Sequence, residues 1–518
     1  MHLGYLIDNA ILRHGKHLAI YDDIRQLSYD ELDVRSRRLA NWFLAQGVVA
    51  GDAVASLQHN SLESIEVELA TTRYGLVRTL LNAKARTADH VEALNLIQAR
   101  GLVYGSEFEQ VADRLREEVP SLAFTLRVES DHASDSAYET ALRSASDAPS
   151  AANLHLATPH SVYFTSGTTG RPKGILLNHG NWIAVIRNHL VDTYSSTDRR
   201  SVVLHAAPMS HASGALVFTH LMRGAAQRVL RRFEPEAVLD AFEHDKISNV
   251  WLAPTMLIML MEDPSFDRRD LSALRNVRYG GAPMAAERVR EAVRRFGPVL
   301  CSGWGQWEAP QQCTYLSSSH IVEAIAQNRT DLLASVGQSV TFGRVGIFDD
   351  AGKALPPNTE GEVAVAGDHL MVGYIGQPKL TADLRFGPWQ RTGDIGRIDH
   401  QGFVHLTDRK NDLIITGGSN VYPREVEEVL YAHPAIREAV AIGIADDKWG
   451  QTIGAIAVLR SGATLSGEAL IQWCKERLPN YKRPRIVEFV SDLPKNAYGK
   501  ILRRQVSEQY GPKSERGI

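Results

Sequence analysis

The sequence predicts an α/β protein with a large N-terminal domain of mostly parallel sheets flanked by helices, a small β subdomain and a smaller α+β domain at the C-terminus. The 518 residues exceed what one hydrophobic core usually supports, so two or more domains are expected. Strand-like apolar runs alternate with helical patterns up to about residue 345, which is typical of a parallel sheet with crossover helices. After about Val336, short alternating runs broken by Gly and Pro indicate a small antiparallel β subdomain.

The first 150 residues begin the alternation of helices and strands. Ser28 is an N-cap-like residue that leads into a predicted helix through Ala45. A short strand follows at Ala53–Leu57, and a second helix is expected near Ser61–Tyr74. The segment Ser130–Asn153 is rich in Ser, Ala and Asp with weak periodicity, so we expect a loosely ordered connection there.

The rest of the chain continues the alternation and then changes character. Further strands of the large domain are expected at Ser161–Phe164, Ser201–His205, Val250–Ala253, Asn276–Tyr279 and Val299–Cys301. Strands of the β subdomain are expected at Gly346–Phe348, Glu362–Val365 and Phe403–Leu406. The C-terminal unit is expected to contain helices Pro423–Tyr431 and Ser466–Arg477, strands Glu438–Gly443 and Gly454–Leu459, and a tail over Asn480–Ile518.

Composition excludes several classes of function. A net charge of −3 and a pI near 6.7 favour neither nucleic acid nor an acidic membrane as a partner. The N-terminus lacks the features of a signal peptide, and no apolar run approaches the length of a membrane helix. Three cysteines form neither a disulfide framework nor a metal-binding pattern. We therefore expect a soluble cytoplasmic protein.

A glycine- and hydroxyl-rich loop, Tyr163–Gly174, is the most informative stretch of the chain. Glycines let backbone N–H groups turn toward a ligand, and the hydroxyls, Arg171 and Lys173 add further donors, so the loop suits a polyphosphate. It follows a predicted buried strand, and α/β sheets bind ligands at strand ends. It is not the common P-loop, because Lys173 is followed by Gly174 and not by Ser or Thr.

The segment Ser166–Gly174 resembles the signature loop of the adenylate-forming enzymes, the superfamily of acyl-CoA and aryl-CoA ligases, peptide-synthetase adenylation domains and beetle luciferases. Further motifs of that superfamily recur in order from Leu27 to Lys500, so the resemblance covers nearly the whole chain. It implies ATP, Mg²⁺ and CoA as ligands. The nucleotide-binding positions that it implies in the loop are Thr165, Ser166, Gly167, Thr168, Thr169, Gly170 and Lys173.

Two further motifs resemble the acyl and adenine sides of the family site. In His205–Gly214, the resemblance makes His211 the aromatic gate beside the acyl group, with a catalytic role. Amino-acid-activating relatives carry an aspartate at the next position, and Ala212 offers no counter-charge to an ammonium, so we discount α-amino acids as substrates. In Tyr279–Pro283, the implied adenine-side residues are Gly281, Ala282 and Pro283.

The segment Gly303–Pro310 resembles the family's aromatic-Gly-x-Thr-Glu motif. Trp304 takes the position of the aromatic residue that stacks on adenine, and Gly305 and Gln306 complete the nucleotide-binding turn. Glu308 takes the position of the acid that helps to hold Mg²⁺, together with Thr168 of the loop. Trp307 departs from the family, which commonly has threonine there. Either a loop hydroxyl replaces that contact, or Trp307 lines the acyl pocket.

The remaining motifs lie toward the C-terminus. By resemblance, Asp394 accepts both ribose hydroxyls and Arg409 contacts ribose or phosphate. Asn411 takes the hinge position between a domain over residues 1–408 and a mobile domain over residues 409–518. Gly417 and Gly418 belong to the loop that shapes the CoA thiol channel. Lys500 is the implied catalytic lysine, which orients the carboxylate and offsets charge at the α-phosphate.

Together these observations predict an ATP-dependent, AMP-forming acid–CoA ligase. A ligase that delivers acyl-AMP to a separate carrier protein is the alternative, and a nucleotide-binding regulator without catalysis is a third reading. The partners are a small carboxylic acid and CoA, and a homodimer is one option for the assembly. The expected acyl pocket consists of His211, Ala212, Trp251, Gly281 and Trp307. It suits an apolar acid, and aromatic, alicyclic and medium-chain fatty acids remain open.

Overall fold

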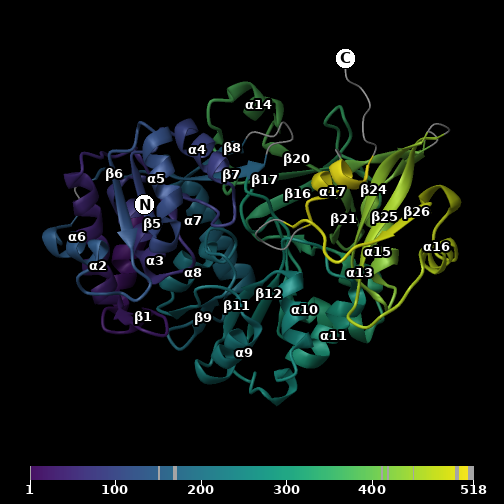
Figure 1. Cartoon of the computed structure of the whole chain (residues 1–518), viewed down its shortest axis with the longest axis horizontal. Coiled ribbons are helices and arrows are strands. Elements are labelled where there is room, and N and C mark those ends of the chain that lie inside the picture. Colours follow the sequence, from purple (N-terminus) through teal and green to yellow (C-terminus); the bar gives the residue numbers. More distant parts are fainter. Residues whose placement is uncertain are drawn as a thin grey trace.

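The computed structural model of the chain describes residues 2–149, 152–166, 172–409, 412–416, 419–446, 449–495 and 501–511. Four larger sheets dominate the described part (Figure 1). Two seven-stranded sheets belong to the first 375 residues, a five-stranded antiparallel sheet follows, and a second five-stranded sheet lies in the C-terminal part. We number them sheets 1 to 4. The predicted α/β class, with a large N-terminal part and a small C-terminal part, is confirmed.

Sheet 1 is parallel except at one edge. Its strands run in the order β13-β12-β11-β9-β10-β1-β2, and only β2 is antiparallel to its neighbour. The strand bounds are β1 Leu18–Tyr21, β2 Gln26–Ser28, β9 Val202–His205, β10 Ala226–Val229, β11 Asn249–Leu252, β12 Asn276–Tyr279 and β13 Leu300–Ser302. The four predicted strands between residues 201 and 301 are therefore confirmed, and they lie in this one sheet.

Sheet 2 carries the glycine-rich loop on one of its strands. Its order is β18-β8-β7-β4-β3-β5-β6, with β8 and β18 antiparallel to their neighbours. The bounds are β3 Ala53–Leu57, β4 Val77–Leu80, β5 Gly101–Gly105, β6 Phe124–Val128, β7 Pro159–Ser166, β8 Pro172–Asn178 and β18 Gly373–Tyr374. The glycine-rich loop thus joins two antiparallel strands, β7 and β8, whereas a P-loop leads from a strand into a helix.

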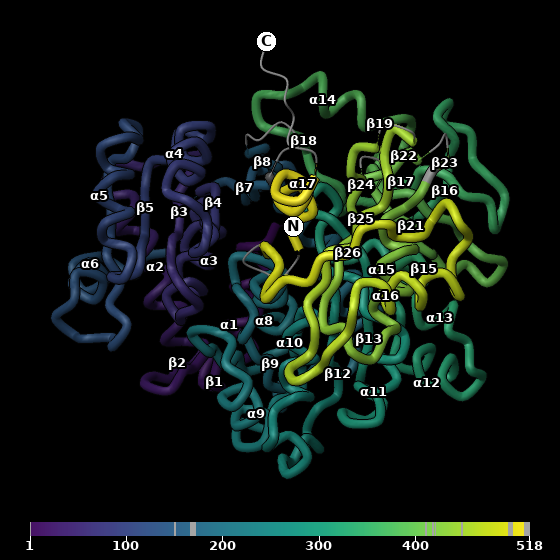
Figure 2. Tube along the Cα trace, turned by 45° about the vertical axis from the view of Figure 1, so that its right-hand side comes forward, coloured from purple at the N-terminus to yellow at the C-terminus, as the bar shows by residue number. Residues whose placement is uncertain are grey.

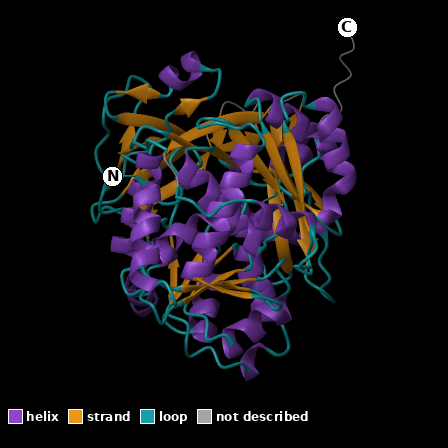
Figure 3. Cartoon of the chain, turned by 90° about the vertical axis from the view of Figure 1, so that its left-hand side faces the viewer, coloured by secondary structure: helices purple, strands orange, loops and turns teal. Residues whose placement is uncertain are grey.

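Helices fill the space between sheets 1 and 2 and cover their other faces (Figure 3). Helix α3 lies between the sheets, and all its residues are buried, which explains why its sequence shows little amphipathic pattern. The helices of this region are α1 Leu3–His14, α2 Tyr29–Ala45, α3 Leu62–Tyr74, α4 Thr87–Leu96, α5 Glu109–Glu118, α6 Ala137–Ser144, α7 His179–Asn188, the π-helix η2 His189–Thr193, α8 Val217–Leu221, α9 Pro235–His244, α10 Pro254–Glu262, α11 Ala286–Phe296, α12 Ser318–Ala326 and α13 Thr330–Ala334.

Sheet 3 confirms the predicted antiparallel subdomain. Its strands are β16 Gly343–Phe348, β17 Gly361–Gly367, β19 Arg385–Phe386, β20 Trp389–Ile398 and β21 Val404–Arg409. Its described strands pair antiparallel throughout. The short ribbon β14 Thr314–Tyr315 with β15 Gln338–Ser339 and the helix α14 Pro378–Asp383 lie in the connections around it. Strand β21 ends at Arg409, one residue beyond the predicted domain boundary after residue 408. The position of that boundary stays a prediction.

Sheet 4 and three α-helices make up the described part of the C-terminal region, drawn in light green to yellow in Figure 2. The elements are β22 Ile414–Thr416, β23 Ser419–Val421, α15 Pro423–Tyr431, β24 Ile436–Asp446, β25 Gly450–Leu459, α16 Gly467–Lys475, β26 Ile486–Phe489 and α17 Arg503–Tyr510. Helices α15 and α16 pack on one face of the sheet, and α17 packs on the other through the buried Val506. None of the described helices combines the length and the apolar character that a bilayer crossing requires.

The expectation of a loosely ordered connection is wrong, and the segment predicted only as a tail contains regular elements. Within Ser130–Asn153 the chain forms α6, because Tyr138, Ala141 and Leu142 fall on one helical face and join the core under α2. Within Asn480–Ile518, β26 adds a parallel strand beside β25, and α17 covers the sheet. In both cases packing against a distant element stabilises a segment whose local signal is weak.

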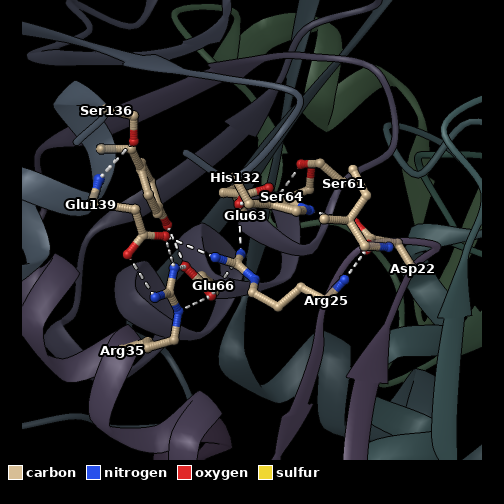
Figure 4. A network of polar contacts seen from close by, with 12 residues as sticks. Asp22, Arg25, Arg35, Ser61, Glu63, Ser64, Glu66, His132, Ser136 and Glu139 are labelled. Atoms are coloured by element: carbon tan, nitrogen blue, oxygen red, sulfur yellow. Dashed lines mark hydrogen bonds and ion pairs between the residues drawn. The ribbon is translucent and has the colours of Figure 1, made fainter. Parts of the chain in front are cut away.

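A buried network of ion pairs joins α2, α3, α6 and the β1–β2 turn (Figure 4). Arg25 bridges Glu63 at 2.7 Å and Glu139 at 2.8 Å. Arg35 contacts Glu139 at 2.6 Å and also pairs with Glu66 of α3. Each guanidinium therefore lies between carboxylates from two different elements. The network holds the helices that support sheet 2.

His132 connects a loop to this network, and its charge makes the contact depend on pH. Its imidazole contacts Asp22 at 2.6 Å and Glu63 at 2.9 Å. Burial disfavours the imidazolium, but the hydrogen bonds to Asp22 and Glu63 outweigh burial and raise the pKa of His132 to about 9. A rise from the usual 6.5 to about 9 corresponds to about 3 kcal/mol of stability.

Replacement of His132 by alanine should therefore destabilise the protein most at low pH. Because the folded-state pKa is raised, the stabilisation is fully present below pH 6.5 and is lost as the pH rises through about 9. Urea unfolding of wild type and His132→Ala at pH 6 and pH 10 should give a difference of about 3 kcal/mol at pH 6 and a much smaller one at pH 10. The exposed His400→Ala is the control. If wild type and His132→Ala differ by the same free energy of unfolding at both pH values, the His132 charge does not stabilise the fold.

Candidate functional site

Three side chains predicted to contact the nucleotide meet at one carboxylate. Asp394, in β20, is 5% exposed. The Trp304 indole donates to its Oδ2 at 3.0 Å, and the Gln306 amide donates to the same oxygen at 2.8 Å. Arg409, its partner on β21, places Nε 3.0 Å from Oδ1. A carboxylate has about four acceptor sites, so Asp394 retains capacity for a ligand hydroxyl beside these three donors.

Glu308 and Lys173 lie on either side of one tyrosine. The Tyr374 hydroxyl donates to Glu308 Oε1 at 2.8 Å, and the Lys173 ammonium lies 5.5 Å from the Tyr374 ring centroid. Burial raises the pKa of Tyr374, and the Glu308 charge raises it further, so the phenol stays a donor. The Glu308 carbonyl accepts from Met371 N at 3.0 Å and from the Gln390 amide at 2.9 Å. These bonds hold the Glu308 backbone against sheet 3.

The Glu308 carboxylate fits a role as a Mg²⁺ ligand. It is partly exposed, and Oε1 is the oxygen that receives the tyrosine hydroxyl. Mg²⁺ prefers oxygen ligands and is usually held by one or two carboxylates together with substrate phosphates. Among the residues that the structure describes, no group of three or more His, Cys, Asp or Glu side chains could hold a metal ion. The second predicted ligand, Thr168, lies outside the described residues.

The glycine-rich loop is described only at its two ends. Thr165 pairs with Lys173, and Ser166 pairs with Pro172, in the β7–β8 hairpin. Gly167, Thr168, Thr169 and Gly170 lie in the gap between residues 166 and 172, for which the structure gives no description. The hairpin register therefore places Thr165 and Lys173 directly opposite each other on β7 and β8, the strands that flank the loop.

Trp307 belongs to a row of three aromatic rings, which we call the aromatic wall: Tyr163, Trp307 and His211. The indole of Trp307 stacks on Tyr163 with centroids 3.7 Å apart and planes at 13°. Its other neighbour, His211, meets it edge-on at 5.0 Å and 72°. Behind the wall, Arg78 donates to the Tyr163 hydroxyl at 2.7 Å and pairs with Glu68 at 2.9 Å. This position agrees with an acyl-pocket location for Trp307.

The other predicted pocket residues gather around Trp251 on β11. Gly281 has φ +83°, and a Cβ there would lie 3.6 Å from the Trp251 ring. Ala212 packs against the cluster that contains Trp251. Ala282 and Pro283 lie in the turn between β12 and α11. A side chain at Gly305 would approach the Gln311 backbone to 2.9 Å, which requires glycine at that position.

The cysteines are unsuited to nucleophilic chemistry. Cys301, Cys313 and Cys474 are buried free thiols. Burial raises the pKa of Cys301 to about 12 and that of Cys474 to about 11. Because the thiolate is the reactive form, these thiols are unreactive at neutral pH. This agrees with a reaction that forms no covalent intermediate with the protein.

Several predicted residues lie outside the described part of the chain. They are Asn411 at the predicted hinge, Gly417 and Gly418 of the predicted thiol channel, and the predicted catalytic Lys500. On either side of the lysine motif, Lys495 and Ile501 pair antiparallel, so the segment between them begins and ends side by side. The roles of these four residues stay predictions.

Sequence reasoning missed two polar residues of this region. Tyr374 has no motif around it, and only the pairing of β18 with β8 brings its hydroxyl to Glu308. Arg278 lies in β12 between Val277 and Tyr279 and is 2% exposed. An arginine immediately before Tyr279-Gly280-Gly281 is a signal that could have drawn attention to it, because buried charges cluster at functional sites.

Comparison with known proteins agrees with this geometry. Residues 7–375 match the model of the AMP-binding enzyme family, and residues 425–500 match that of the AMP-binding enzyme C-terminal domain. A feruloyl-CoA synthase of Amycolatopsis sp. is 34% identical over 94% of this chain and 94% of its own length. A medium/long-chain-fatty-acid–CoA ligase of Mycobacterium tuberculosis is 32% identical over 100% of this chain and 91% of its own. The ATP-bound structure of MatB from Rhodopseudomonas palustris has a TM-score of 0.88 at 27% identity, covering 98% of this chain and 99% of that one.

The prediction of an ATP-dependent, AMP-forming acid–CoA ligase is confirmed by these matches, with ATP, CoA and a small carboxylic acid as its substrates. The carrier-protein alternative finds no better support. The protein is a member of the AMP-binding enzyme family.

Proposed function

We propose which residues of this ligase act in each of its two half-reactions. In the first, the substrate carboxylate attacks the α-phosphate of ATP in line and releases pyrophosphate. In the second, the CoA thiol attacks the acyl-AMP carbonyl and AMP leaves. Neither step needs a protein nucleophile, so the protein contributes positioning and charge stabilisation. The convergence of Trp304, Gln306 and Arg409 on Asp394 is the single observation that carries the proposal.

The Asp394 carboxylate accepts the ribose hydroxyls in this proposal. Trp304 and Gln306 hold it from one side and Arg409 from the other, so its oxygens are oriented before the nucleotide arrives. Trp304 offers an indole face to adenine, and Gly281, Ala282 and Pro283 form the opposite side. A glycine at positive φ lets the backbone approach the base closely.

Cations offset the phosphate charge at the other end of the nucleotide. Lys173 extends from β8 beside the glycine-rich loop, whose hydroxyls and N–H groups face the phosphates in this proposal. Glu308 and Thr168 would hold Mg²⁺, which would supply positive charge to neutralise the phosphates. Lys500 orients the attacking carboxylate and stabilises charge that develops at the α-phosphate.

The acid binds beside the aromatic wall and Trp251. His211 closes the pocket near the reacting carboxylate, and the stacked pair of Trp307 and Tyr163 forms a flat apolar surface. Relatives named for ferulic acid and for medium- and long-chain fatty acids support apolar acids as substrates.

After adenylation, residues 409–518 rotate about Asn411 and bring Gly417 and Gly418 to the thiol channel.

The proposed function is tested by product analysis across acids. AMP release and thioester formation are measured with benzoates, cinnamates, alicyclic acids and C4–C12 fatty acids, and ATP/pyrophosphate exchange is measured without CoA. Thioester formation that depends on CoA is expected for one class. Exchange without transfer to CoA would favour a carrier protein as the acceptor, and absence of exchange with ATP still bound would overturn the proposed chemistry.

Replacement of Trp307 by threonine, the residue common in related enzymes, separates the two roles considered for it. Threonine removes the indole face that the proposal places against the acid, and an aromatic contact is worth about 0.5–1.5 kcal/mol beyond its buried area, so the acid should bind up to about 10-fold more weakly. We expect the KM for the acid to rise while the KM for ATP changes less than about 3-fold.

Trp307→Phe, which retains a ring against Tyr163, is the matched control and should stay near wild type. If Trp307→Thr changes the KM for ATP and leaves that for the acid unaltered, Trp307 acts at the phosphates and the acyl-pocket role is wrong. Steady-state kinetics with each substrate varied in turn distinguishes these results.

The homodimer and the cytoplasmic location belong to the same proposal as predictions from sequence. Light scattering after size-exclusion chromatography measures the first, and fractionation of the source cells measures the second. A monomer at micromolar concentration would contradict the homodimer. Neither result affects the catalytic assignments.

A further inference from the structure

A buried arginine lies on the same face of sheet 1 as the pocket residue Trp251. In the parallel register, Arg278 of β12 pairs with Trp251 of β11 and with Cys301 of β13. Residues paired in this way project to the same side of a sheet. Arg278 is 2% exposed, so its guanidinium lies in the protein interior beside Trp251.

The partners of this guanidinium are all neutral. Arg278 Nη1 lies 3.2 Å from His189 Nε2, and Nη2 donates to the Gln311 carbonyl at 2.9 Å. Burial and the Arg278 charge lower the pKa of His189 far below its usual range, so the imidazole is uncharged. Across the described residues, no carboxylate comes within ion-pair distance of Arg278, whereas the equally buried Arg78 pairs with Glu68 at 2.9 Å.

Other unpaired donors lie in the same region. Arg278 Nε and Gln312 Nε2 are buried and have no hydrogen-bond partner among the described residues. Gln312 is 1% exposed, and the Thr193 hydroxyl donates to its Oε1 at 2.9 Å, which leaves its amide N–H groups available. Buried donors without acceptors are rare and costly. A guanidinium and an amide with free N–H groups suit an anionic oxygen ligand.

The Arg278 guanidinium lies beside Gly303, the first residue of the predicted nucleotide-binding segment Gly303–Pro310. A Cβ at Gly303 would lie 3.3 Å from Arg278 Nη2, and a Cβ at Gly280 would lie 3.3 Å from the Gly303 carbonyl. Trp307 and His211 are partly exposed, while Arg278 and Trp251 are buried. In the proposed function the acid enters past this partly exposed aromatic wall, so the buried Trp251 and Arg278 lie farther from solvent than the wall, where the far end of the acid would lie.

We propose that Arg278 determines specificity by pairing with a second carboxylate at the far end of the substrate, so that the enzyme activates dicarboxylic acids. The proposal rests on the proposed function and refines its substrate class. The first carboxylate reacts with ATP, and the second receives hydrogen bonds from Arg278 and Gln312. A buried guanidinium without a counter-ion favours a ligand that brings the missing negative charge.

The test uses acids that differ only in the charge at the far end. Terephthalate is compared with its monomethyl ester, and suberate with its monomethyl ester, in AMP release with CoA. Wild type should prefer each diacid over its ester by about 30-fold in kcat/KM. Arg278→Met should lower kcat/KM about 30-fold for the diacid and less than 3-fold for the ester. Arg275→Met, an exposed arginine near the start of the same strand, should leave the ratio unchanged.

Three outcomes overturn the inference. Equal activity with diacid and ester in wild type, or a preference for the ester, excludes the second carboxylate while the ligase function stands. A wild-type diacid preference that survives in Arg278→Met assigns recognition to another residue. No AMP from any acid, with ATP still raising the Tm, removes the proposed function and this inference together. If Arg278→Met does not fold, the wild-type ratio decides by itself, and Gln312→Leu should lower it about 5-fold.

Discussion

Lys500→Ala is expected to lower the rate of acyl-AMP formation by about 10³-fold, because a preorganised charge at the α-phosphate contributes only as the transition state forms. The second half-reaction should behave differently. If residues 409–518 rotate and Lys500 leaves before CoA attacks, synthetic acyl-AMP and CoA should still give thioester within about 3-fold of the wild-type rate. Rapid-quench assays of each half-reaction measure both rates.

Lys495→Ala is the matched control for this experiment. Lys495 lies in the same motif but pairs with Glu438 at 2.8 Å and with Asp492 at 2.6 Å, so its charge is already engaged within the C-terminal part. We expect adenylation close to wild type in that variant. Equal losses in both half-reactions of Lys500→Ala would show that the lysine supports the fold or both steps, and would contradict its assignment to adenylation alone.

Asp394→Asn should raise the Kd for AMP and the KM for ATP about 100-fold. The amide keeps the size of the side chain but removes the charge and half of its acceptor capacity, and its N–H₂ group would face the Trp304, Gln306 or Arg409 donors. A buried charged hydrogen bond lost to a ligand costs about 2–3 kcal/mol, which corresponds to roughly 30- to 150-fold. Calorimetric titration with AMP measures the change.

Asp368→Asn controls for a general effect of removing a carboxylate, since Asp368 is 76% exposed and pairs with the side chain of Arg187. Its AMP affinity should equal that of wild type. Thermal unfolding without ligand checks whether Asp394→Asn remains folded. We expect that it does, because Arg409 is half-exposed and its ion pair with Asp394 contributes little to the free energy of unfolding. An unchanged Kd for AMP in a folded Asp394→Asn would remove Asp394 from the ribose contact and with it the observation that carries the proposed function.

The elements that could be predicted from sequence are those whose signals are local. Ser28 and Glu31 cap each other's backbone N–H groups at the start of α2, and this contact spans only three residues. Pro423 begins α15 at its first position, as its fixed φ favours. Apolar runs such as Val202–His205 became buried parallel strands because both faces of sheet 1 are covered. The ordered motifs likewise led to Asp394, Glu308 and Trp304, since each motif carries its chemistry within a few residues.

The sequence by itself thus determined the fold class, the family, the order of the motifs and most of the residues proposed for the site. Only the tertiary structure decided which side chains meet: Tyr374 with Glu308, Trp307 with Tyr163 and His211, and Arg278 with neutral partners in place of a carboxylate. It also decided that α6 is a helix, because its apolar face packs in a core shared with α2, which lies far from it along the chain. The physical reason is the same in each case, since burial and charge pairing depend on residues that lie far apart along the chain.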